Sequence, residues 1–539
     1  MIRSSGAPAF FALSLACLIL YFHYGFLKAG VPVRLLGLPL AAAASLAAIK
    51  WRWEEKLPKF RSRSENALFS AIAVLFLAGQ LYLLTVPNQL WIMSEYLRVT
   101  GIGFEHLPGD CYRLGIFLVA TAGWYAVKRL FLLVWRQVEE PVGRLWRSLD
   151  RFDAILFLLG ILIFGTAVII CFHSTNLFYY PWPPYVKEYD ILFTSDSGIL
   201  AADCTYINLF SQENDFRQML FALFSLHVLL FHLPAYFLPL ESWVRGAAYA
   251  LPQLVFLEGA VLLLAHLLGL KRWDKAAFFL LANSSFPVLL FSLMQEQYVI
   301  AVFFLLLYLL LCRETGAGVL LAAAGGTLSS SAIALFLIPG ETWRRRRNVL
   351  VQAILFGGGM ALVTAKWGLI GKLIQKLHLY ATFTGKGVPW ANKWEQYLHF
   401  ISSCFIAPQI VESDRTLQLA PPSGDIAWDG ILIGALLICA YLLNRHDDRA
   451  RLCFRWMLFS TFLLLVVGWG SMENGMVLYT LYFQWASCAL LWLLTEKIFY
   501  GCPWGRRLVI GITAAGMLAC NVPAIYAIWQ WGTINYPTV

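Results

Sequence analysis

The segment 173–218 carries a dense group of side chains that could do acid–base chemistry. It reads HSTNLFYYPWPPYVKEYDILFTSDSGILAADCTYINLFSQENDFRQ, and long apolar stretches flank it. Its acids outnumber its bases: they are Glu188, Asp190, Asp196, Asp203, Glu213 and Asp215, against Lys187 and Arg217. An ionised carboxylate in such surroundings needs water, a cationic partner or a bound cation, and a carboxylate held in place can act as a general base. We take this segment as the first candidate site, with a solvated loop as the alternative for any one acid.

Cationic side chains form the second half of a possible site, because a phosphate leaving group needs fixed positive donors. The candidates are Arg217, Lys187, Lys386, Lys393 and Arg415. Arg217 is favoured by its place beside the acids, although an ion pair with Asp215 or Glu213 explains it equally well. The stretch TFTGKGVPWANKW (382–394) could close over a phosphate, with an aromatic anchor at a membrane interface as the plainer explanation.

Single ionisable residues elsewhere in the chain are further candidates. Glu296 in MQEQY and Glu473 in GSMENGM are predicted at the outer ends of apolar stretches. We favour Glu296 as a substrate contact and a solvated carboxylate for Glu473. His173 and His399 could bind metal or move protons, but lone histidines at membrane interfaces usually only form hydrogen bonds.

The elements that must position these residues are membrane helices. The chain has 539 residues, of which 60% are hydrophobic and only 13% charged, so water cannot solvate most of its surface. Apolar stretches at 67–87, 152–172, 249–270 and 452–468 have about the 20 residues that a helix needs to cross a bilayer. We therefore predict an all-α, polytopic helical membrane protein with about 13–15 membrane helices and large outer loops that carry interfacial helices.

Basic residues cluster between the apolar stretches and so predict the topology. The positive-inside rule places these clusters in the cytoplasm and the loops 173–218 and 367–428 together outside. The net charge of +10 is thereby explained without nucleic acid as a partner. This topology requires 219–240 to lie at the outer interface instead of spanning, and the serines of TLSSSA (327–332) to break an apolar run into two short spans.

Three regions are predicted along the chain. Residues 1–151 form an N-terminal group of four membrane helices, 152–347 a core with the acidic outer loop, and 348–539 the remaining membrane helices. The scattered cysteines show neither a disulfide framework nor zinc-ligand spacing.

At this point the sequence resembles the GT-C superfamily of polytopic membrane glycosyltransferases. That family has an Asp-Glu pair about twenty residues before a His-Pro-Leu-Phe-like motif, and DSG at Asp196 and RQMLF at 217–221 stand at the corresponding places. The resemblance extends over about 152–347, through SSFPVLLFSLMQEQYVIAVFFLLLYLLLCRE (284–314) and GVLLAAAGGTLSSSAIALFLIP. The chain departs from the family in having Asp-Ser for the acid pair and Gln-Met for the His-Pro.

The resemblance implies transfer of a sugar from a polyprenyl-phosphate carrier to a glycan, lipid or protein acceptor on the extracytoplasmic face, and from the style of the loops we expect a bacterial plasma membrane. Asp196 is the expected general base, as the resemblance also implies, and Asp190 is a second catalytic candidate that could position the acceptor. Arg217, Glu213, Asp215, Glu296, Lys187 and Lys386 would bind substrate. Asp190 and Glu213 could share Mg²⁺ or Mn²⁺, since carboxylates suit both ions.

Three other functions stay open from the sequence. A secondary transporter would need ionisable residues near the membrane midplane, and Glu258 in VFLEGA is one such residue. A lipid-linked polysaccharide polymerase or ligase would share the donor but favour basic outer loops. A noncatalytic accessory protein is the third alternative.

Overall fold

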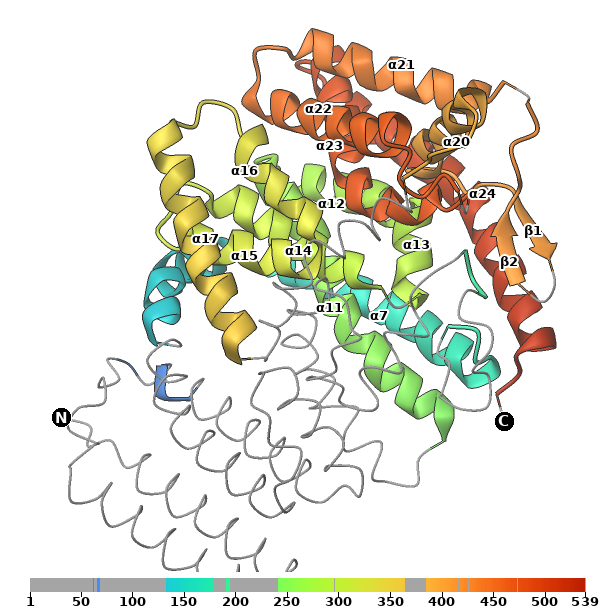
Figure 1. Ribbon diagram of the computed structural model, residues 1–539, viewed down its shortest axis with the longest axis horizontal. Helices are drawn as coiled ribbons and strands as arrows, with labels where there is room; N and C mark the ends of the chain where they lie inside the picture. Colours follow the sequence, from blue (N-terminus) through green and yellow to red (C-terminus); the bar gives the residue numbers. More distant parts are fainter. Residues whose placement is uncertain are drawn as a thin grey trace, which may run out of the picture. The chain divides into compact units, whose positions relative to one another are not determined.

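The computed structural model is mostly helical and describes residues 62, 65–67, 132–178, 191–193, 241–294, 296–363, 384–413, 416–424, 426–472 and 474–538 (Figure 1). The chain divides into two compact units, Met1–Arg144 with Phe210–Glu213, and Leu145–Leu209 with Asn214–Val539. In the first unit Arg136 pairs with the buried Glu65 at 3.0 Å. The fold below is that of the second unit.

The described elements of the second unit follow one another in this order: α7 (Arg151–Ser174), α11 (Ser242–Leu267), α12 (Arg272–Asn283), α13 (Phe286–Leu293), α14 (Gln297–Leu311), α15 (Ala317–Thr327), η2 (Ser329–Ile333), α16 (Ala334–Leu337), α17 (Trp343–Val363), α20 (Trp390–Ser403), β1 (Ile410–Ser413), β2 (Thr416–Leu419), α21 (Trp428–Leu443), α22 (Asp448–Ser460), η3 (Thr461–Val466), η4 (Met476–Tyr479), α23 (Thr480–Ile498) and α24 (Pro503–Asn535).

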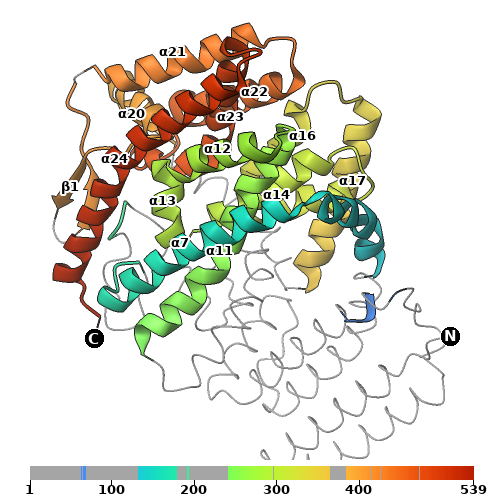
Figure 2. The same cartoon turned by 180° about the vertical axis from the view of Figure 1, so that it is seen from behind.

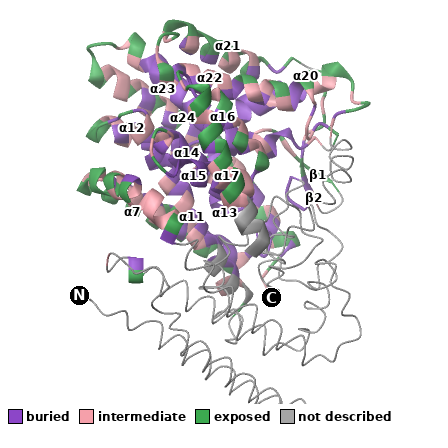
Figure 3. Cartoon of the chain, turned by 60° about the vertical axis from the view of Figure 1, so that its left-hand side comes forward, coloured by how far each residue is buried: buried purple, intermediate pink, exposed green. Residues whose placement is uncertain are grey.

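Membrane helices are confirmed. Among the described residues, α7, most of α11, α23 with η4, and α24 are each long and apolar enough to cross a bilayer, and the bent pair α12–α13 makes a fifth candidate. Large apolar side chains are exposed along α7 and α21, whereas buried residues gather around α14 and α15 (Figure 3). A helix surface of exposed leucine and isoleucine is stable in lipid, so the protein is an integral membrane protein.

α7 and α11 form an antiparallel pair. Asp153 at the start of α7 contacts His266 at the end of α11, and the rings of His173 and Trp243 meet at the other end, 5.3 Å apart. The chain therefore leaves α7 and enters α11 at the same end of the pair, as the predicted topology requires. The segment 219–240, predicted to lie at the interface, is outside the described residues.

The first apolar span after α11 is broken instead of straight. α12 and α13 meet at an angle of 69° around Ser284 and Ser285 (Figure 2). Asn521 of α24, fully buried, donates to the carbonyl oxygens of Ser284 and Phe405, and Phe405 accepts from the N–H of Phe286. A break inside lipid is tolerated where neighbouring groups satisfy the freed backbone, and Asn521 has that role here.

The predicted break at 327–332 is confirmed. α15 ends at Thr327, a 3₁₀ turn follows, and Tyr482 of α23 hydrogen bonds to Ser331 at 3.1 Å. The chain then returns to its starting end, because Arg345 donates to the carbonyl of Cys312. Both limbs are short, as the sequence predicted.

The last helices pack side by side, with α21, α22 and α23 next to one another and α24 against α12 and α13 (Figure 1). The span expected at 452–468 is α22 followed by a π-helical segment, η3, so it is helical but not uniformly α. The predicted outer loop 367–428 contains α20, whose tryptophans Trp390 and Trp394 are exposed, as expected of an interfacial helix. It also contains the hairpin β1–β2, which the all-α prediction did not include.

The helix ends fall into two layers. We call the layer that holds the turns 268–275, 312–316, 444–448 and 498–503 the basic end, and the layer that holds α20, the β-hairpin and 467–479 the opposite end. Arg449 donates to the carbonyl of Leu268, and Arg506 pairs with Asp274, so basic clusters far apart in sequence share one layer. The positive-inside rule thus groups them correctly.

Candidate functional site

Most residues of the predicted site lie outside the described residues. These are Asp196, Asp190, Arg217, Glu213, Asp215 and Lys187, so their proposed roles, including a divalent cation at Asp190 and Glu213, stay predictions. Glu296 and Lys386 are described. Within the described part of the chain, no group of three or more histidine, cysteine, aspartate or glutamate side chains could hold a metal ion.

Three separate stretches of chain meet at the opposite end. Ile191–Phe193, all buried, lie beside β2, where the N–H of Phe193 donates to the carbonyl of Leu417 at 2.9 Å and the N–H of Leu417 donates to that of Ile191 at 2.7 Å. Asn474 donates to the carbonyls of Leu419 and Ala420. The middle of the predicted acidic loop is therefore attached to the hairpin, and the hairpin to the loop before α23.

The lysine-bearing turn before α20 joins the same layer. The N–H of Gly385 donates to the carbonyl of Val467 at 3.1 Å, and Gln396 donates to that of Ser471 at 3.2 Å. A Cβ on Gly385 would lie 2.2 Å from the Ser471 hydroxyl, and Gly468 has a φ of +76°, so both glycines are needed for this close approach.

Lys386 in that turn and Lys393 in the first turn of α20 are the cations of this region. Lys386 is exposed, and Lys393 is half-buried with its ammonium beside Gly468. Among the described residues neither lysine has an ion-pair partner. Positive charge at the edge of a membrane protein is therefore available here to an anion from outside the chain.

Glu296 lies at the start of α14, with 1% of its surface exposed. Its backbone N–H donates to the side-chain oxygen of Gln253 at 3.3 Å, while the amide nitrogen of Gln253 donates to the carbonyls of Phe291 and Met294 at 3.0 Å. Gln253, next to Pro252 in α11, thus fixes the turn that presents Glu296. Sequence reasoning missed Gln253, although a glutamine beside a proline within an apolar span was a usable signal.

An aromatic group connects Glu296 to the loop layer. Tyr298 packs edge-on against Tyr479 at 5.7 Å, and the indole of Trp469 donates to the Tyr479 hydroxyl at 2.7 Å. The segment 467–479 is therefore contacted by two regions that are distant in sequence. One is the start of α14, which carries Glu296 and Tyr298, and the other is the turn that carries Lys386.

Two other predicted candidates have structural partners. Glu395 accepts from the backbone N–H groups of Ser423 and Gly424 at 2.7 and 3.0 Å, and His399 lies 4.0 Å from Glu395. His173 packs on Trp243. These contacts give both histidines a role in packing.

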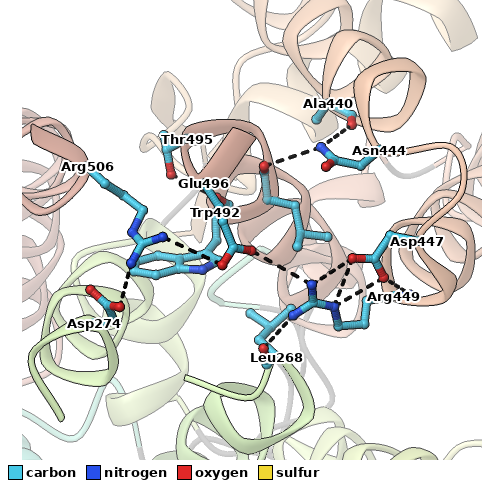
Figure 4. Close-up of polar contacts among 11 residues, drawn as sticks. Leu268, Asp274, Ala440, Asn444, Asp447, Arg449, Trp492, Thr495, Glu496 and Arg506 are labelled. Atoms are coloured by element: carbon cyan, nitrogen blue, oxygen red, sulfur yellow. Dashed lines mark hydrogen bonds and ion pairs between the residues drawn. The ribbon is translucent and has the colours of Figure 1, made fainter. Parts of the chain in front are cut away.

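The basic end holds an extended ion-pair network (Figure 4). Arg506 pairs with Asp274 and Glu496 and stacks over Trp492, Arg507 binds Asp274 at 2.7 Å, and Arg449 joins Glu496 to Asp447. Burial alone would raise the pKa of Asp447, but the hydrogen bonds of Arg449 outweigh it and hold that pKa below its ordinary value. The network connects the turns before α12, α22 and α24 to the end of α23.

Asp153 is a buried acid between the helices that sequence reasoning missed. It is 1% exposed, binds Lys275, which is 4% exposed, and lies 3.2 Å from His266. Glu258, which the sequence already marked as an ionisable residue near the midplane, is fully buried and accepts from the amide of Asn283 at 3.1 Å. For Asp153 the available signal was an acid just inside the start of an apolar stretch.

No family model, no curated protein and no solved structure matches this chain.

Proposed function

We propose that the protein is a membrane glycosyltransferase that moves a sugar from a polyprenyl-phosphate carrier to an acceptor on the face formed by the opposite end. The observation that supports this most is that Ile191–Phe193, which lie between Asp190 and Asp196 in the sequence, share this layer with Lys386 and with Lys393 at the start of α20. Acid and cation are the two chemical parts that such a transfer needs.

The proposed division of labour follows from charge. A lipid-linked sugar keeps its phosphate near the membrane surface, where Lys386 and the half-buried Lys393 offer charge that no described carboxylate neutralises. Departure of the phosphate places negative charge next to these ammonium groups. Asp196 takes the proton of the acceptor hydroxyl as the new bond to the anomeric carbon forms, with Asp190 beside it in sequence.

Glu296 is proposed as a substrate contact at the membrane side of this layer. It is held by Gln253 and adjoins Tyr298, whose ring packs on Tyr479. A carboxylate that accepts from sugar hydroxyls, next to aromatic rings, is suited to a carbohydrate.

The test is transfer of radiolabelled sugar from a panel of polyprenyl-phosphate donors by the full chain in lipid nanodiscs. We expect transfer or donor hydrolysis by the native chain, a loss of about 100-fold or more in Asp196→Asn, and a raised KM for the donor in Lys393→Gln. Lys497→Gln is the matched control, because Lys497 is an exposed lysine at the basic end. No turnover with any donor contradicts the proposal, and unchanged turnover in Asp196→Asn removes the assigned base.

A secondary transporter remains the second candidate, favoured by the broken pair α12–α13 and the buried Glu258. Uptake of a solute into vesicles that depends on Glu258, together with absence of sugar transfer, would favour it. Sugar transfer that persists in Glu258→Gln would favour the transferase.

A further inference from the structure

Glu258 lies where three helices meet, in the second half of α11. Gly160 of α7 packs directly on it, since a Cβ on Gly160 would be 2.3 Å from Glu258 Oε2 and 3.0 Å from the ring of Phe279. Asn283, the last residue of α12, donates to Oε2 at 3.1 Å. Because Gly160 has no side chain, the carboxyl group of Glu258 fits closely between the helices.

The polar atoms of this pair are incompletely satisfied. Glu258 Oε1 and Asn283 Oδ1 are both buried, and neither has a hydrogen-bond partner among the described residues. A buried carboxylate with one amide contact lacks the charge compensation that it needs in an apolar interior. A carboxylic acid has a donor for one of these acceptors and carries no charge.

No ion pair of Glu258 is present among the described residues. α13 and α14, which pack on α11, contain no lysine, arginine or histidine, and α7 has only Arg151 and His173, in its first and last turns. The nearest cations along the helices are His266 on α11 and Lys275 on α12, each eight positions from Glu258 or Asn283, or roughly 12 Å as helix. Both are bound to Asp153.

The other cationic residues of the surrounding helices stand in their first or last turns: Arg151 and His173 on α7, Arg245 on α11, Arg272 on α12 and Lys497 on α23. The other ionisable groups are acids or weak acids: Asp153 and Cys171 on α7, Tyr249 on α11, Asp274 on α12, Tyr298 and Tyr308 on α14, and Tyr482, Cys488 and Glu496 on α23. None of them supplies a positive charge beside Glu258.

We infer that Glu258 and Asn283 form a proton-binding site inside the helix bundle, in which Glu258 holds a proton and shares it with the side-chain amide of Asn283. Because the oxygen and nitrogen of an asparagine amide are interchangeable in such an assignment, the same 3.1 Å contact suits a carboxylic acid that donates to the amide oxygen. Asn283 is the last residue of α12 and stands directly before the 69° bend between α12 and α13. Binding or loss of the proton therefore changes a hydrogen bond at this bend.

The direct test is infrared difference spectroscopy on the full chain in lipid nanodiscs at neutral pH. A protonated carboxylic acid gives a carbonyl band above the amide I region. We expect that band in the native chain, its loss in Glu258→Gln, and its shift to higher frequency in Asn283→Leu, where the hydrogen bond is removed. Glu496→Gln is the control and should leave the band unchanged, because Glu496 is paired with arginines. A native spectrum identical to that of Glu258→Gln in this region overturns the inference.

A second measurement separates proton binding from simple packing. An unfolded chain gives up this proton at about pH 4.3, the ordinary value for glutamate, while the folded chain keeps it to higher pH, so the unfolding temperature of the native chain should fall with rising pH over that range, and Glu258→Gln should lack this fall. Parallel profiles for the two chains contradict a proton on Glu258, even if both fold.

Discussion

Asp153 and Glu258 are two buried acids on the same interface of α7, α11 and α12, but their surroundings differ. Asp153 accepts from the N–H of Asp150, binds Lys275 and lies beside His266. Glu258 has one amide and a glycine as its polar and steric neighbours. The contrast shows that burial alone does not decide the state of a carboxyl group. Asp153 has a cation within contact distance, whereas Glu258 has none among the described residues, and that lack favours a neutral Glu258.

The largest effect in this comparison is expected from Lys275→Met. It leaves Asp153 buried without its main cation, which typically costs about 3–5 kcal/mol of stability. The measurement is equilibrium unfolding in mixed micelles.

The control is the double variant Asp153→Asn with Lys275→Met, which removes both charges. It should recover a large part of the loss, since the two residues act as a pair. Equal destabilisation by the single and double variants would show that Lys275 acts through packing and not through its charge.

Gly160→Ala is expected to have the next largest effect. Its methyl group would overlap Glu258 Oε2 and force the helices apart, at about 1–3 kcal/mol for an overpacked interior. Gly357→Ala, where no atom lies within 4 Å of the added Cβ, is the matched control. A wild-type unfolding curve for Gly160→Ala would mean that α7 does not pack on Glu258 as described.

Glu258→Gln should have a small effect, under about 1 kcal/mol, because it replaces a neutral acid by a neutral amide of the same shape. Asp153→Asn, tested beside it by the same unfolding assay, should cost clearly more because it leaves Lys275 buried without its carboxylate. If the two substitutions are equally costly, the distinction between the paired and the neutral acid fails.

The smallest effect concerns acid pH at the start of α7. The hydrogen bond from the backbone N–H of Asp153 lowers the pKa of Asp150, the N-cap. A lowered pKa in the folded state gives stability that is present above the unfolded value, about 3.9, and is lost as pH falls through the folded value. The unfolding temperature should therefore decrease less between neutral and acid pH in Asp150→Asn than in the native chain. An equal decrease in the two chains would rule out this contribution.

The sequence predicted the parts of the fold that depend on local composition. The lengths of the apolar stretches predicted α7 and α11, and the serines of 327–332 predicted the break after α15. The basic clusters predicted which helix ends lie in the same layer. It could not give the 69° break at Ser284, because that break depends on Asn521, more than two hundred residues away. The β-hairpin was missed for a similar reason, since its strands are short and its partner Ile191–Phe193 is distant in sequence.

For the candidate site, the sequence supplied the residue types and the tertiary structure supplied their neighbours. Glu296 and Lys386 were chosen from spacing and resemblance, but only the fold shows that Gln253 holds the first and that the loop 467–479 adjoins both. Asp196 and Arg217 stay predictions from the sequence.

The sequence alone determined that this chain is inserted in a bilayer. Transfer of an apolar helix into lipid depends on its composition and length and requires no contact with another part of the chain. Which of its buried acids has a cationic partner was decided only by the tertiary structure. A carboxyl group responds to the atoms within a few ångströms of it, and those atoms come from helices that the sequence keeps far apart.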